Sequence, residues 1–219
     1  MDQKLYSIIT PVYNSGPKIE KSIQSVLSQK KGLCEFIIMD GGSADETLTH
    51  IEPYKEELRL VSQKDRGVYD AMNQAIDLAT GKYIYFLGAG DCLRPYALEE
   101  IGALLPIEQL SFVYGNVYWV DEAFIYGGEF TKARLKNYNI CHQAIFYERT
   151  VFEVVGKFEL RFKVLADYVL NMKCFGDDRI QKKYIDYVIA NFEGGGLSAR
   201  EEDSALVKEH SKLVGEYLG

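Results

Sequence analysis

The sequence lacks any segment that stays apolar for long enough to cross a membrane. Its first residues, MDQKLYSIITPVYN, also lack the apolar core of a signal peptide. We therefore expect a cytoplasmic protein. Cysteines are few and form no CxxC pair, which argues against a zinc site and for reduced core thiols. The four cysteines are Cys34, Cys92, Cys141 and Cys174.

Clusters of basic residues are missing as well. The chain has 25 lysines and arginines against 32 aspartates and glutamates, a formal net charge of -7. This balance argues against a nucleic-acid partner. An anionic ligand stays possible, because backbone amides at the start of a helix can hold a phosphate without any side-chain charge.

Three common motifs of nucleotide-binding and hydrolytic proteins are absent. No GxGxxG follows the first apolar run, and neither GxxxxGK[ST] nor GxSxG occurs. We therefore do not expect a dinucleotide-binding dehydrogenase, a P-loop protein or an α/β-hydrolase. Any phosphate must then be bound by a metal ion or by cationic and amide donors.

The sequence does contain an alternation of apolar runs and helical patterns. Of its 219 residues, 47% are hydrophobic and 13% aromatic, which is enough for a packed core. The alternation predicts an α/β fold with parallel strands and helices on both faces of the sheet. The expected strands are 5–12, 35–39, 58–61 and 82–87. The expected helices follow Pro17, a Ser43/Glu46 capping box and Pro95, and cover 68–79, with Gly81 as its cap.

This regularity ends after about residue 100. Residues 111–130 predict two paired strands joined by a turn at Asp121-Glu122. Further strands are expected at 143–147 and 184–192, and helices at 149–155, at 166–175 and at the end of the chain. Because no repeat or linker is found, we predict one domain over 1–219. Its first half, to about residue 100, is the nucleotide-type half, and the second is more irregular.

Polar residues collect where the first four strands end. Ligands of an open parallel sheet bind beyond the carboxyl ends of its strands. Helix caps alone do not need acids at three successive strand ends, so we expect a binding site at this edge. Carboxylates there suit hydrogen bonds to a ribose or a base, or the binding of a divalent cation. The residues are Pro11, Tyr13, Asn14, Asp40, Asp65, Arg66 and Asp91.

Four segments resemble family 2 glycosyltransferases in their order, spacing and flanking strands. They are SIITPVYN, SIQSVLSQ, EFIIMDGGSADET and KDRGVYDAMNQAIDLATGKYIYFLGAGD. The resemblance is strong over about 5–100 and looser over 140–170. It implies the GT-A fold, with a Rossmann-like sheet that binds the nucleotide-sugar and a mixed-sheet second half that binds the acceptor. It also implies inverting transfer from a nucleotide-sugar, with Mg²⁺ or Mn²⁺ as cofactor.

The resemblance assigns a role to each matching residue in the donor pocket. Pro11 and Tyr13 would line the base pocket, with the Tyr13 ring available for stacking. Asp40 would bind the base or the ribose. Asp65 and Arg66 would close over the nucleotide.

The acidic motif that ends the fourth strand in this family is altered here. Residues 88–91 read Gly-Ala-Gly-Asp, so the first acid is missing and Asp91 is the metal-binding carboxylate that remains. Gly90 would let the backbone approach the sugar nucleotide closely. One carboxylate is enough for a magnesium or manganese ion if the diphosphate and water complete its shell.

An inverting transfer also needs a base that takes the proton of the acceptor. Asp167 lies near the start of an apolar helix, and the resemblance places a catalytic carboxylate there. The alternative is an acid that only stabilises the helix dipole. Further contacts with the substrates are expected from His142, Gln143 and Arg200.

The leading hypothesis is an inverting glycosyltransferase that uses a UDP-sugar and a glycan or lipid-linked acceptor in cell-surface polysaccharide biosynthesis. A lipid-linked acceptor would bring it to the inner face of the membrane, although acids near the final helix argue against strong attraction to anionic lipid. Two alternatives stay open. One is a nucleotide-sugar-binding protein without catalysis, and the other is a sugar nucleotidyltransferase. The sequence predicts no oligomeric state.

Overall fold

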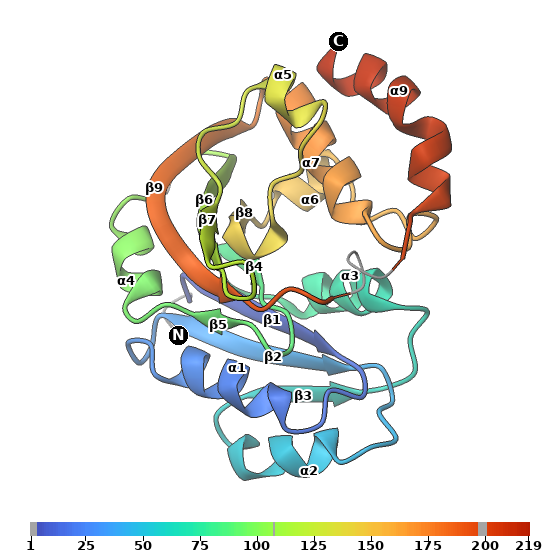
Figure 1. The fold of residues 1–219 in the computed structure, drawn as a ribbon. Helices are drawn as coiled ribbons and strands as arrows, with labels where there is room; N and C mark the ends of the chain where they lie inside the picture. Colours follow the sequence, from blue (N-terminus) through green and yellow to red (C-terminus); the bar gives the residue numbers. More distant parts are fainter. Residues whose placement is uncertain (1–3, 107, 197–200) are drawn as a thin grey trace.

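The computed structural model describes residues 4–106, 108–196 and 201–219. In this part of the chain, nine strands form one curved, mixed sheet that runs through both halves (Figure 1). The strand order is β3-β2-β1-β4-β8-β6-β9-β5, and β7 pairs with β6. The predicted α/β class with a mixed second half is confirmed. The assignment of donor and acceptor binding to separate halves stays a prediction.

The first half forms the parallel part of the sheet. It comprises β1 (Tyr6–Val12), β2 (Cys34–Asp40), β3 (Arg59–Ser62) and β4 (Tyr83–Phe86). Helices α1 (Lys18–Leu27) and α2 (Thr47–Ile51) lie on one side, and α3 (Val68–Leu78) lies on the other (Figure 1). A 3-10 turn, η1 (Glu52–Tyr54), follows α2. Because β2 and β4 pair with opposite edges of β1, the strand order reverses between β1 and β4.

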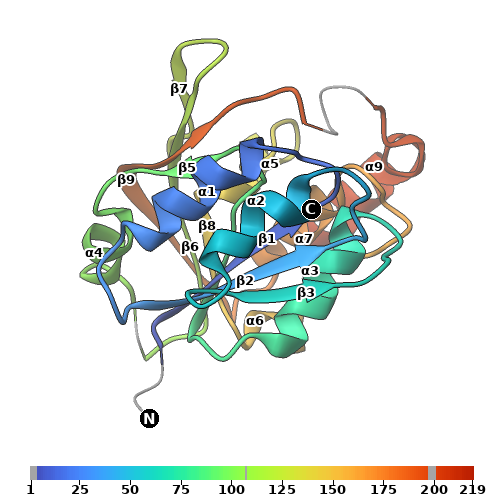
Figure 2. The same cartoon turned by 90° about the horizontal axis from the view of Figure 1, so that it is seen from below.

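The second half extends this sheet with strands of both directions. Strand β8 is antiparallel to β4 and β6, β9 is parallel to β6, and β5 is antiparallel to β9. The strands are β5 (Cys92–Leu93), β6 (Ser111–Trp119), β7 (Phe124–Tyr126), β8 (Ile145–Glu148) and β9 (Gln181–Phe192). The helices are α4 (Ala97–Gly102), α5 (Lys132–Leu135), η2 (His142–Ala144), α6 (Val151–Val154), α7 (Ala166–Gly176) and α9 (Ser204–Leu218). Figure 2 shows the β6–β7 hairpin projecting from the body of the protein.

Two predictions about helix ends were wrong. The predicted Ser43/Glu46 capping box does not form, because α2 begins only at Thr47 and Ser43 accepts a hydrogen bond from a neighbouring loop. Gly81 does not cap α3 either. It lies against strand β1, where a Cβ atom would stand 2.4 Å from the carbonyl carbon of Tyr6. A glycine is needed there for close packing of backbone against backbone.

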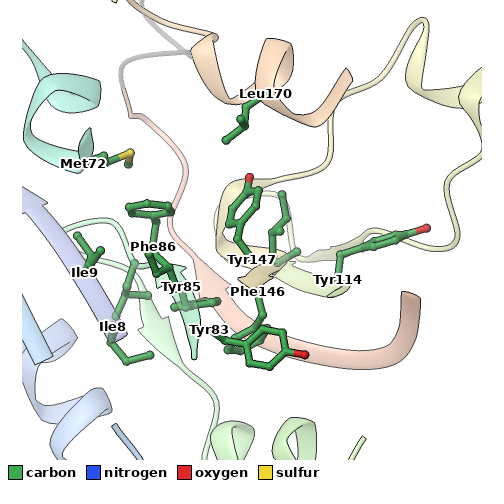
Figure 3. Close-up of a cluster of buried hydrophobic side chains, with 14 of the residues drawn as sticks. Ile8, Ile9, Met72, Tyr83, Tyr85, Phe86, Tyr114, Phe146, Tyr147 and Leu170 are labelled. Carbon is green, nitrogen blue, oxygen red and sulfur yellow. The ribbon is translucent and has the colours of Figure 1, made fainter. Parts of the chain in front are cut away.

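Aromatic side chains join the two halves of the core (Figure 3). Tyr85 of β4 packs on Phe146 of β8, with ring centroids 4.7 Å apart. Tyr147, the next residue of β8, points the other way, toward Leu170 on α7. This alternation lets β8 bury one side chain against the first half of the chain and the next against α7. Among the described residues, no helix is long and apolar enough to span a bilayer.

Candidate active site

A cavity of about 480 Å³ lies where the carboxyl ends of β1 and β4 meet the second half of the chain. The strand order reverses between these two strands, and an open α/β sheet binds its ligands at such a point. Both halves contribute to the walls. The lining includes Pro11, Lys18, Tyr69, Gly88, Asp91, Trp119, Asn139, His142, Gln143, Asp167, Phe192, Glu193 and Gly194.

Asp91 lines this cavity and is only 6% exposed. Gln143 Nε2 donates to its Oδ2 at 2.6 Å, and the backbone N–H of Glu193 donates to its Oδ1 at 3.0 Å. Burial raises the pKa of Asp91 to about 6, although the Gln143 amide and the charges of His142 and Lys21 oppose this shift. Burial therefore disfavours the charged form of this carboxyl group, and a cation beside it would favour that form.

The two glycines before Asp91 both fit the local geometry. A Cβ at position 88 would lie 2.5 Å from Asp91 Oδ2, so Gly88 leaves room for the carboxylate. Gly90 has φ +104°, a backbone conformation that glycine adopts without strain. Its N–H donates to Ser22 Oγ on α1 at 2.8 Å. The Gly-Ala-Gly-Asp segment thus folds Asp91 back over Gly88, and an acid at position 88 would meet Asp91.

Asp167 lies in the first turn of α7 and also lines the cavity. It is 5% exposed. Its Oδ1 lies 2.9 Å from the hydroxyl of Tyr69, and its Oδ2 accepts a hydrogen bond from Asn139 Nδ2 at 3.0 Å. His142 Nδ1 lies 3.7 Å from Oδ2. The carboxylate is therefore buried and oriented by other segments, beyond what a residue that only stabilises a helix dipole needs.

Asp40 and Asp65 lie at the same edge of the sheet but do not line the cavity. Asp40 is 1% exposed, and its carboxylate accepts hydrogen bonds from the N–H groups of Gly42 and Ser43 and from Ser62 Oγ. Asp65 Oδ1 accepts from the N–H of Gly67 at 2.8 Å. Both acids therefore fix the loops that follow β2 and β3. Their predicted contacts with a nucleotide stay predictions.

Tyr13 and Arg66 are exposed at this edge. The Tyr13 side chain is 65% exposed after β1, while Pro11 is buried and lines the cavity. Arg66 forms a two-point ion pair with Asp70 in the first turn of α3, which lowers the pKa of Asp70. Tyr13 is thus accessible to a ligand from outside the cavity. Arg200 lies outside the described residues.

Four further lining residues received no role from the sequence, although Tyr69 lies within the segment KDRGVYDAMNQAIDLATGKYIYFLGAGD that resembles the family. Tyr69 and Asn139 contact Asp167 but lie 98 and 28 residues away from it. Lys18, at the start of α1, places an amine at the cavity. Glu193 follows β9 and forms an ion pair with Lys21 of α1. Only the folded chain brings these side chains to the site.

The side chains at the cavity fit a divalent cation only if a bound substrate supplies most of its ligands. The described residues contain no cluster of three or more His, Cys, Asp or Glu side chains that could hold a metal. Asp91 alone supplies a carboxylate at the position expected for the metal, and carboxylate oxygen is a ligand that Mg²⁺ and Mn²⁺ prefer. The residues therefore fit a cation whose remaining ligands come from a bound diphosphate and water.

Comparison with known proteins decides the family of this chain. The sequence profile described as "Glycosyl transferase family 2" matches residues 7–168. The chain belongs to this family. This glycosyltransferase is 39% identical over 216 residues to the PGL/p-HBAD biosynthesis glycosyltransferase Rv2957 of Mycobacterium tuberculosis, across 95% of this chain and 84% of that protein. The enzyme is thus related to glycosyltransferases of glycan and glycolipid biosynthesis, as the resemblance implied.

A second relative and two solved structures extend the comparison. The chain is 25% identical over 226 residues to the UDP-Glc:alpha-D-GlcNAc-diphosphoundecaprenol beta-1,3-glucosyltransferase WfgD of Escherichia coli, across 100% of this chain and 88% of that protein. The structure of S. aureus TarS 1-349 in complex with UDP-GlcNAc has a TM-score of 0.75 at 18% identity, covering 97% of this chain and 66% of that one.

The mannosyltransferase PcManGT of Pyrobaculum calidifontis, in complex with GDP-Man and Mn²⁺, has a TM-score of 0.69 at 18% identity. It covers 88% of this chain, which spans 57% of that protein. At this identity the two solved neighbours establish the fold, and the GT-A prediction is confirmed. This chain therefore corresponds to about two thirds or less of each of these two solved chains.

Proposed function

We propose that this glycosyltransferase moves a sugar, with inversion, from a UDP-sugar to a hydroxyl of a lipid-linked or glycan acceptor. The observation that carries the proposal is that two buried carboxylates, Asp91 and Asp167, from different halves of the chain, line one cavity. UDP is supported by two relatives, because WfgD is named for UDP-Glc and TarS is solved with UDP-GlcNAc.

The donor would bind across the end of β1. Pro11 and the exposed ring of Tyr13 suit the base, and Asp40, Asp65 and Arg66 shape the neighbouring loops. Lys18 suits the diphosphate, because its ammonium is a compact positive charge at the cavity. Asp91 would hold Mg²⁺ or Mn²⁺, and that cation would neutralise charge on the departing diphosphate.

The reaction needs one proton acceptor and one leaving group. Asp167 would take the proton of the acceptor hydroxyl while its oxygen forms a bond with the anomeric carbon. The bond from that carbon to the diphosphate oxygen breaks at the opposite face, and the electron pair leaves with UDP. One glycosidic bond replaces one glycosyl-phosphate bond. Because the acceptor attacks on the face opposite the leaving diphosphate, the configuration at the anomeric carbon inverts.

The acceptor would enter beside the β6–β7 hairpin. Trp119 and Phe192 form an aromatic wall of the cavity, with ring centroids 5.3 Å apart. Such rings suit the apolar faces of a sugar or of an aromatic aglycone. WfgD is named for a diphosphoundecaprenol acceptor. A similar acceptor would be reached from the cytoplasm at the inner face of the membrane, and sedimentation with vesicles that carry the acceptor would test this.

The proposal is tested by measuring binding and transfer together. Calorimetry of UDP and a panel of UDP-sugars, with Mn²⁺ or with EDTA, gives affinities, and product formation with a lipid-linked sugar gives turnover. We expect Asp167→Asn to leave donor affinity within about twofold but to reduce kcat by about 10²–10⁴-fold, the usual contribution of a general base. Asp178→Asn, exposed beyond the far end of α7, is the matched control and should keep full turnover.

The same experiment separates the enzyme from a protein that only binds nucleotide-sugars. A binding protein would show donor affinity and no transfer by the unmodified chain with any acceptor. Full turnover by Asp167→Asn would instead refute the assignment of Asp167 as the base.

A further inference from the structure

The carboxylate of Asp167 is held by side chains from two segments outside its own helix. Tyr69 of α3 reaches Oδ1, and Asn139, in the segment between α5 and η2, reaches Oδ2. Tyr69 comes from the donor half of the chain and Asn139 from the other half. The acid is therefore fixed from both halves at the place where they meet.

Asn139 is itself oriented by a chain of buried hydrogen bonds that begins at Tyr147. The Tyr147 hydroxyl, which points toward α7 in Figure 3, donates to Asn171 Oδ1 at 3.0 Å. Asn171 Nδ2 donates to the carbonyl oxygen of Ile140 at 3.2 Å and to Asn139 Oδ1 at 2.8 Å. A backbone carbonyl only accepts, so Ile140 fixes which end of the Asn171 amide faces it.

The direction of every bond in this chain follows from that one carbonyl. With Asn171 Nδ2 facing Ile140 and Asn139, the Oδ1 of Asn139 is the acceptor. Its Nδ2 must then face Asp167 and donate to Oδ2. Asn171 is fully buried, so water cannot replace these partners without opening the core.

Tyr69 supplies the second donor. Its hydroxyl lies 2.8 Å from the carbonyl oxygen of Val164 and 2.9 Å from Asp167 Oδ1, so one proton is shared between two acceptors. Burial and the nearby Asp167 charge raise the pKa of Tyr69 well above its ordinary value, which keeps the hydroxyl protonated. Tyr69 therefore holds both Asp167 and the segment that leads into α7.

We propose that Tyr69 and Asn139 are positioning residues that fix the Asp167 carboxylate for proton transfer, with Asn171 setting the direction of Asn139. The inference rests on the proposed role of Asp167 as the base. Two donors on two different oxygens fix both the plane and the rotation of the carboxylate. A base that is fixed in this way can present a lone pair to an acceptor hydroxyl without first rotating.

The first test removes only the hydroxyl of Tyr69. We expect Tyr69→Phe to lower kcat about tenfold and to leave the KM for the donor within about twofold, because small misplacements of a base slow the chemical step. The matched control is Tyr168→Phe. Tyr168 follows Asp167 in the sequence, and its buried hydroxyl donates to the carbonyl oxygen of Leu135. The control should keep kcat within about twofold.

The second test removes the amide donor. Asn139→Leu should lower kcat about tenfold with donor KM unchanged, while Asn137→Leu, exposed on the same segment, should have no effect. If both positioning variants behave like their controls, or if the loss falls on the donor KM and not on kcat, the inference is overturned.

A double variant separates this inference from the proposed function. In the Asp167→Asn background, Tyr69→Phe should cause no further loss of the residual turnover, because residues that act through one another are not additive. An equal tenfold loss in both backgrounds would overturn the positioning role and leave the base assignment intact. Wild-type turnover in Asp167→Asn alone would overturn the base assignment itself.

Discussion

Two pairs of aspartates lie at the ligand-binding edge of this sheet, and their surroundings differ. Asp40 and Asp65 follow β2 and β3 and accept hydrogen bonds from the loops in which they lie. Asp91 and Asp167 are as well buried as Asp40 but face the cavity. The first pair holds the loops after β2 and β3, and the second pair faces the cavity, where we propose that the chemistry takes place. Aspartates near one edge of the sheet therefore differ in whether they hold a loop or face the cavity.

The largest loss of stability should come from replacing Asp40. Asp40→Ala leaves the N–H groups of Gly42 and Ser43 and the hydroxyl of Ser62 without their acceptor. We expect a loss of about 2–3 kcal/mol in the free energy of unfolding, measured by urea denaturation. Asp65→Ala removes an acceptor from Gly67 alone and should cost less. Equal losses in the free energy of unfolding would show that the additional hydrogen bonds of Asp40 do not stabilise the protein more than the single one of Asp65.

Replacing Asp91 should change the free energy of unfolding in the opposite direction as the pH rises. Its pKa is raised to about 6, so the folded protein binds a proton more tightly there than the unfolded chain does. The stability that this proton provides is present below about pH 4 and is lost as the pH rises through about 6. The stability of Asp91→Asn, which cannot ionise, relative to that of the unmodified chain should therefore rise by up to about 3 kcal/mol between pH 4 and pH 8.

Urea denaturation in EDTA buffer between pH 4 and pH 8 measures this difference. The advantage of Asp91→Asn should grow with pH, and the variant should transfer sugar poorly. A pH-independent difference would mean that Asp91 is already compensated in the folded protein and is not kept in an unfavourable state for a ligand.

The smallest effect is expected from replacing Tyr13, the exposed tyrosine after β1, and it concerns the affinity for UDP. Tyr13→Ala should raise the Kd for UDP about tenfold if the ring stacks on the base, because stacking of a base on an aromatic ring is worth about 1–3 kcal/mol. The melting temperature should not change, since the side chain is 65% exposed. Tyr96→Ala, at a similarly exposed tyrosine directly before α4, is the control. An unchanged Kd would remove Tyr13 from the donor site.

The sequence predicts the parallel half of this fold well, because its signals are local. Apolar runs such as 82–87 become buried strands, and the acids that follow them gather at one edge since parallel strands end together. Asp91 could be singled out for the same reason, whereas Asp167 was singled out by its place near the start of an apolar helix and by the family resemblance. Both then proved to line one cavity.

The sequence does not predict which acids face the cavity, because this depends on distant partners. Asp91 is held by Gln143 and by the backbone of Glu193, 52 and 102 residues away. Tyr69 lies within an ordinary helical pattern and Asn139 within a loop, so neither carries a local signal for its contact with Asp167. The wrong prediction that Gly81 caps α3 also reflects a distant partner, because a glycine after a helix is compatible with a cap or with close packing against another strand.

A crystal structure with an intact UDP-sugar tests the central claim most directly. The account predicts that the diphosphate lies beside Asp91 and Lys18, and that the anomeric carbon faces the Asp167 carboxylate with room for an acceptor hydroxyl between them. A donor bound with its diphosphate away from Asp91, or with its anomeric carbon turned away from Asp167, would contradict it.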